Sequence, residues 1–167
     1  MRLSRFVGCF ATITVALFAG GALATSSGST VTAQASLDAT IDFTLAPPDQ
    51  QPTCLMAIGG IVSWTGDYLA HASPLPGDLV RVWGDAAVDF TAGDYTATAK
   101  FTYDGISTPD ANAEVIVMAP VDVDFVSSKS PDVVKTIFRF EAGANVGDSG
   151  ILPWSLALQK YMDITCR

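Results

Sequence analysis

Two aspartates on one predicted strand are the closest that this sequence comes to a metal-binding pattern. Asp122 and Asp124 are two positions apart in an apolar segment, and side chains at that spacing project from one face of a strand. Clustered carboxylates are ligands that calcium prefers. The contiguous spacing of a calcium-binding loop is missing, so a solvated strand face is the expected interpretation. Calcium binding by the pair is left open, and no cofactor is predicted.

His71 is the only histidine and the best candidate for acid–base chemistry. It lies close in sequence to Ser73 and Asp67, which are the residue types of a serine hydrolase. Such an enzyme also needs its nucleophile on a strained turn, and the chain has no G-x-S-x-G pattern. We therefore expect an exposed loop histidine, and we predict that the protein is not an enzyme.

Cys54 and Cys166 are predicted to form a disulfide bond. The third cysteine, Cys9, lies in an N-terminal segment that we expect to be removed, so an even pair is left. A crosslink over so long a loop contributes about 4–5 kcal/mol in the chain-entropy model. The alternative is a pair of free, buried thiols. If the bond forms, it should bring the second strand of the domain beside the last one.

Residues 1–24 have the organisation of a secretory signal peptide. Arg2 and Arg5 precede an uncharged apolar run, and Ala22-Leu23-Ala24 is a small-x-small cleavage site. The apolar run is short for a membrane anchor, which is the alternative. We expect a secreted, extracellular protein with no integral membrane segment. A flexible lead-in is predicted over 25–36, and a single domain over 37–167.

The charge of the chain excludes one large class of partner. It has 9 basic and 17 acidic residues, for a formal net charge of −8. An acidic surface repels phosphate backbones, so no nucleic acid partner is expected.

Short alternating segments separated by turn signals predict an all-β fold. In Tyr95–Tyr103 every odd position is apolar and every even one polar, which is the pattern of a half-buried strand. Asp104-Gly105 should then be a turn. About eight such strands predict an immunoglobulin-like two-sheet β-sandwich. The other predicted strands are 37–45, 54–64, 79–83, 88–90, 114–118, 121–126, 133–142 and 154–166, with a glycine-rich loop over 143–153.

Large apolar residues on these strands are the candidates for lining a ligand site between the sheets. The alternative for tryptophans and other aromatic residues is that they fill the core. The candidate ligand-binding residues are Trp83, Tyr95, Phe101, Phe138, Phe140 and Leu158.

The layout from Cys54 onward resembles the ML (MD-2-related) lipid-recognition family. The segments that carry the resemblance are Pro74-Leu75-Pro76-Gly77-Asp78, Gly93-Asp94-Tyr95 and Ile164-Thr165-Cys166. The resemblance implies a secreted β-sandwich that holds a lipid or sterol between its sheets. The internal cysteine pairs common in that family are missing here.

The N-terminal part resembles bacterial fimbrial subunits instead. Thr30-Val31-Thr32-Ala33 followed by Leu37–Leu45 is similar to a pilin donor strand, which completes the sheet of a neighbouring subunit. Two functions are therefore expected. The first is a non-enzymatic binding protein for a hydrophobic small molecule, and the alternative is a structural or adhesive surface subunit that binds another surface protein.

Overall fold

The computed structural model describes residues 25–27, 30–147, 150–157 and 164–167, and within them nine strands form one antiparallel sheet. Strands β1 to β8 follow one another in chain order across the sheet, while β9 pairs with β7. The strands are β1 (Thr25–Ser27), β2 (Thr30–Asp42), β3 (Ile61–Leu75), β4 (Leu79–Ala92), β5 (Tyr95–Ser107), β6 (Glu114–Ser127), β7 (Val133–Gly147), β8 (Gly150–Ala157) and β9 (Ile164–Cys166).

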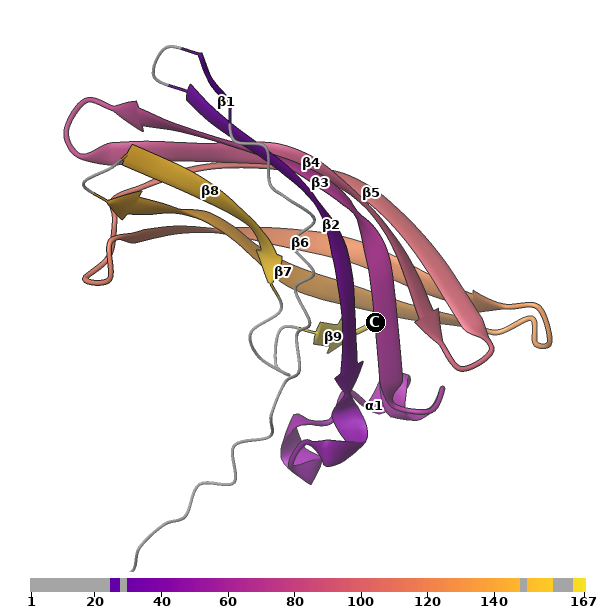
Figure 1. Ribbon diagram of the computed structural model, residues 1–167. Coiled ribbons are helices and arrows are strands. Elements are labelled where there is room, and N and C mark those ends of the chain that lie inside the picture. Colours follow the sequence, from indigo (N-terminus) through magenta and orange to yellow (C-terminus); the bar gives the residue numbers. More distant parts are fainter. Residues whose placement is uncertain (1–24, 28–29, 148–149, 158–163) are drawn as a thin grey trace, which may run out of the picture.

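The sheet folds over on itself into a nearly barrel-shaped body. Figure 1 shows β2–β5 as one layer, with β6–β8 facing it, and β8 lies beside β2 and β3. The all-β prediction is confirmed. The immunoglobulin-like division into two sheets is not, because the described strands pair in one continuous order. Strands β1 to β8 lie in the sheet in their chain order, which is the arrangement of a meander and not that of a Greek key.

Several strands are longer than the sequence predicted. The segments 79–83 and 88–90 are parts of one strand, β4, and Asp104-Gly105 continues β5 instead of forming a turn. β6 likewise runs through Pro120, which is exposed and lies where β6 pairs with β7 but not with β5. Proline has no N–H to donate to a neighbouring strand. It is tolerated here because this part of β6 pairs with a neighbour on one side only.

The N-terminal lead-in is partly a strand. β2 begins at Thr30, inside the segment 25–36 that was predicted to be flexible, and its register with β3 runs from Val31–Ala72 to Asp42–Ile61. Inward Ala33, within the predicted lead-in, and Leu37, just after it, are both buried, so this part of the chain packs against the rest of the fold.

A short cap follows β2 and replaces the predicted strand around Cys54. It consists of two 3₁₀ turns, η1 (Phe43–Leu45) and η2 (Pro48–Gln50), and helix α1 (Thr53–Met56). Gly59 and Gly60, with φ of 109° and 74°, then turn the chain into β3, in a conformation that favours glycine. Phe43 and Leu55 have no exposed surface, so the cap closes one end of the core.

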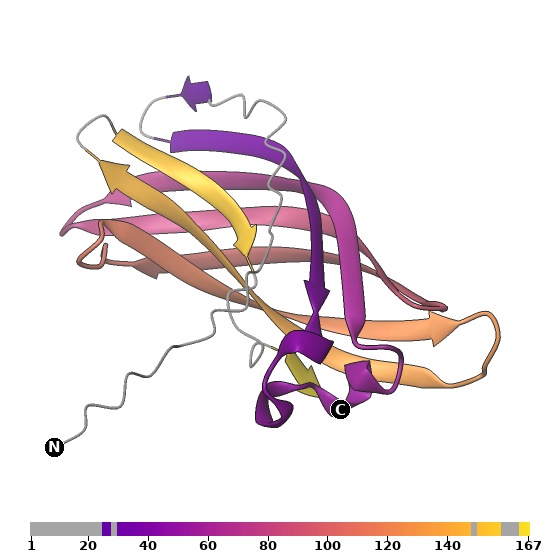
Figure 2. The ribbon, with the colours of Figure 1, turned by 60° about the horizontal axis from the view of Figure 1, so that its bottom comes forward.

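The predicted disulfide between Cys54 and Cys166 is confirmed. Its topological consequence differs from the prediction, because Cys54 lies in α1 and not in a strand. The bond therefore ties the cap, and not the second strand, to β9. Figure 2 shows the cap and β9 at the lower end of the molecule. Pairing of β9 with β7 is limited to Thr136–Phe138 opposite Ile164–Cys166.

The core has two different halves. Near the cap it is built from aromatic side chains, among them Trp64, Phe90 and Phe125, which are at most 5% exposed. Near the opposite end, the inward residues are small. They include Ala70, Ala72, Val82, Val115, Ala142 and Ala144, all with 0% exposure.

Candidate functional site

Four of the predicted ligand-binding residues lie on the inner face of the sheet. Tyr95 and Phe101 are on β5, and Phe138 and Phe140 are on β7. The register of β5 and β7 places them inward because buried residues alternate with exposed ones along both strands.

Two of these four residues are ordinary core. Phe138 is 0% exposed and Phe140 1%, so both rings are enclosed by other protein atoms. The Phe138 ring centroid lies 5.3 Å from that of Phe90 and 5.9 Å from that of Phe140. These spacings are those of well-packed aromatic pairs.

The other two residues, Tyr95 and Phe101, are half-buried, and Phe101 lies where the sheet is least continuous, whereas Tyr95 is paired with Ser127 of β6. β5 and β6 are in register only at Tyr95–Ser127 and Thr96–Val126, and their remaining described residues do not pair with each other. We call this break in the pairing, bounded by 97–107 of β5 and 114–125 of β6, the seam. Phe101 lies on the β5 side of the seam.

Phe101 connects the seam to the core. Its ring stacks on that of Phe140, with centroids 5.9 Å apart and planes at 7°. Phe101 is half-buried while Phe140 is buried, so the pair runs from the partly exposed border into the buried core.

Gly105 and Val117 bring the two strands into contact farther along the seam. A Cβ atom added at Gly105 would lie 2.7 Å from a methyl carbon of Val117, so only glycine lets the strands approach this closely. The prediction of candidate residues missed both positions. Gly105 was assigned to a turn, and Val117 carried only the signal of strand alternation.

Tyr103 lies on the inner face of β5, between Phe101 and Gly105. Its hydroxyl donates a hydrogen bond to the carbonyl oxygen of Leu69, 3.2 Å away. Burial raises the pKa of this phenol well above its ordinary value, with smaller contributions from Tyr68 and Asp85. The neutral form is therefore favoured in the folded protein.

Trp83, the fifth candidate, lies on the outer face of the sheet. On β4 the even positions are buried, so the odd position 83 points away from the core and is half-buried. It belongs to a row of neighbours on four strands, Thr32 on β2, His71 on β3, Trp83 on β4 and Asp104 on β5.

Polar and stacking contacts join this outer row. His71 stacks on Trp83 with ring centroids 5.2 Å apart, and its Nδ1 is 2.8 Å from the hydroxyl of Thr32. The guanidinium of Arg81 lies 5.0 Å from the Trp83 ring and makes a bidentate pair with Asp104. The hydrogen bond from Arg81 lowers the pKa of Asp104, and the same pair raises that of Arg81.

The sixth candidate, Leu158, lies outside the described residues. Asp67 accepts a hydrogen bond from Ser36, and the Nδ1 of His71 lies 2.8 Å from the hydroxyl of Thr32, so the recorded polar partners of this aspartate and this histidine are residues of β2. In the described part of the chain, no three His, Cys, Asp or Glu side chains are grouped to hold a metal ion.

Asp122 and Asp124 both project from the outer face of β6, as their spacing predicted. The guanidinium of Arg167 bridges them, with N–O distances of 3.1 Å and 3.3 Å. All three side chains are well exposed, so this contact contributes little stability.

Comparison of the chain with protein-family models, curated proteins and solved structures gave no match. Of the helices that the structure describes, none has the length and apolar character needed to cross a membrane.

Proposed function

We propose that this chain is an exported, non-enzymatic binding protein that holds a hydrophobic small molecule at the seam between β5 and β6. The observation that carries the proposal is the loss of backbone pairing where half-buried Phe101 and Val117 border the core. The disulfide supports export, because such bonds persist mainly in oxidising compartments.

The chemistry of the seam favours an apolar ligand. The inner face around it includes Ala97, Ala99 and Phe101 on one strand and Val117, Ala119 and Val121 on the other, and the hydroxyl of nearby Tyr103 is hydrogen-bonded to Leu69. An apolar molecule against these side chains would gain about 25 cal/mol for each Å² of surface removed from water. The interior is packed, so the ligand would occupy the border and displace the Phe101 ring from Phe140.

The alternative function, a surface subunit assembled by strand exchange, is less well supported. It requires the N-terminal strand to complete the sheet of another chain. Here β2 pairs with β3 of its own chain along almost its whole length, and inward Leu37 and Ile41 are buried in the same core.

Organic extraction of the purified protein, followed by uptake of a fluorescent fatty acid and a fluorescent sterol, tests the proposal. We expect a hydrophobic compound in the extract or saturable uptake of at least one probe. A clean extract together with no uptake of either probe would overturn the proposal.

A pair of variants on β6 locates the site. Val117→Asp puts a charge at the seam and should weaken probe binding about tenfold or more, because an apolar ligand cannot solvate a carboxylate. The matched control, Val126→Asp, makes the same change at an outward residue that is 50% exposed, and should bind as the wild type does. Circular dichroism verifies folding. If Val117→Asp does not fold, the near-isosteric Val117→Thr replaces it, with a smaller loss expected. Equal binding by the seam variant and the control would place the site elsewhere.

A further inference from the structure

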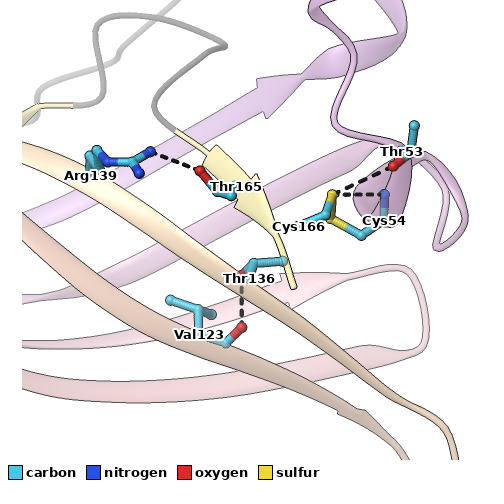
Figure 3. The surroundings of a disulfide bond; sticks show 7 residues. All are labelled: Thr53, Cys54, Val123, Thr136, Arg139, Thr165 and Cys166. Carbon is cyan, nitrogen blue, oxygen red and sulfur yellow. Dashed lines mark hydrogen bonds between the residues drawn. A yellow bond between two sulfur atoms is a disulfide. The ribbon is translucent and has the colours of Figure 1, made fainter.

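The two sulfur atoms of the disulfide have different surroundings. The sulfur of Cys166 accepts a hydrogen bond from the backbone N–H of Cys54, at 3.1 Å, and one from the hydroxyl of Thr53, at 3.7 Å. Figure 3 shows both donors directed at this one sulfur. The two contacts come from the cap, whereas Cys166 itself is on β9.

Hydrogen-bond donors around a sulfur stabilise it most when it carries a negative charge. A thiolate is a stronger acceptor than a disulfide sulfur, so the two donors favour the form in which Cys166 has been released. In thiol–disulfide exchange, the sulfur that leaves more readily is the one whose thiolate is more stable. Attack is then directed to the other sulfur.

We infer that Cys54 is a site of thiol–disulfide exchange, at which an external thiol forms a mixed disulfide while Cys166 leaves as a thiolate. The incoming group is a low-molecular-mass thiol that has lost its proton to solvent. Its sulfur bonds to that of Cys54, the bond to Cys166 breaks, and the electron pair of that bond stays on Cys166. One disulfide replaces another, so no oxidant is needed, and Cys166 takes up a proton from solvent as the pH requires.

The position of the bond makes the exchange consequential. Both cysteines are half-buried and not enclosed in the core. After exchange, β9 would be attached to the rest of the fold by its short pairing with β7, by buried Ile164 and by contacts of Arg167 and Thr165 at the surface. The cap and the C-terminal strand would no longer be covalently linked.

Reaction of the folded protein with reduced glutathione tests the inference. After brief exposure and acid quenching, peptide mass spectrometry measures glutathione on each cysteine. We expect the Cys54 adduct to exceed the Cys166 adduct about tenfold. An adduct mainly on Cys166, equal adducts, or no adduct under excess glutathione would overturn the inference.

Two threonine variants separate the effect of the donors from simple access. Thr53→Val removes the hydroxyl donor at an exposed position and should lower both the exchange rate and the ratio of adducts about threefold. Thr165→Val is the matched control. It removes the hydroxyl of the residue next to Cys166, which accepts a hydrogen bond from Arg139. The structure records no contact between this hydroxyl and the Cys166 sulfur. The variant should leave the ratio unchanged. Equal ratios in all three proteins would show that the hydroxyl has no role.

Discussion

Aromatic rings gather on both faces of this sheet, and the two groups differ in what surrounds them. Inside, Phe138 contacts Phe90, Phe125 and Phe140 and has no exposed surface. Outside, half-buried Trp83 has His71 and Arg81 as its ring neighbours. The inner group gains from burial of apolar area, while the outer one makes cross-strand contacts that are still open to water. Aromatic character alone therefore does not identify a ligand site in this fold.

The largest expected difference between the two faces concerns stability. Phe138→Ala should lower the free energy of unfolding by about 3–5 kcal/mol, because it removes a fully buried ring and leaves a cavity. Urea unfolding followed by tryptophan fluorescence measures the loss. A cost below about 1 kcal/mol would show that the inner rings are loosely packed, and that a ligand could enter the core without help from the seam.

An intermediate effect is expected at Tyr103, which borders the inner group. Tyr103→Phe should cost about 0.5–1.5 kcal/mol near neutral pH through loss of the hydrogen bond to Leu69. The raised pKa in the folded state means that the wild type keeps its full stabilisation below the ordinary tyrosine pKa of 10.0 and loses it as the pH rises through the folded value.

The alkaline part of this prediction is tested by comparing unfolding at about pH 8 and about pH 11. The wild type should lose more of its unfolding free energy between the two than Tyr103→Phe does. An equal loss in both proteins would contradict a buried, neutral phenol at this position.

The smallest effect is expected on the outer face. Trp83→Ala should cost about 1 kcal/mol or less, because cross-strand pairs on an open face contribute only that much. A double-mutant cycle with His71→Ala should give a coupling energy below about 1 kcal/mol. A coupling as large as the cost of Phe138→Ala would remove the distinction between the two faces.

Local patterning predicted the inner face of β5 well. The alternation in Tyr95–Tyr103 identified both the strand and the side of it that is buried, since a period of two follows from strand geometry alone. Trp83 was predicted to line a ligand site between two sheets, but it lies on the outer face. The predicted strand 79–83 has apolar residues at both odd and even positions, so its pattern does not show which set faces inward. That was settled by the register of β4 with β3 and β5.

Strand periodicity, which is a local property, predicted that this chain is all-β. With Cys9 set aside in the expected signal peptide, the count of the remaining cysteines predicted the pairing of Cys54 with Cys166, and the structure confirms both predictions. The tertiary structure decided that the strands form one folded-over sheet, that pairing lapses between β5 and β6, and that Cys54 lies in a cap. These features depend on which strands meet and how closely. They involve close approaches between distant residues, such as Gly105 against Val117, which no local pattern encodes.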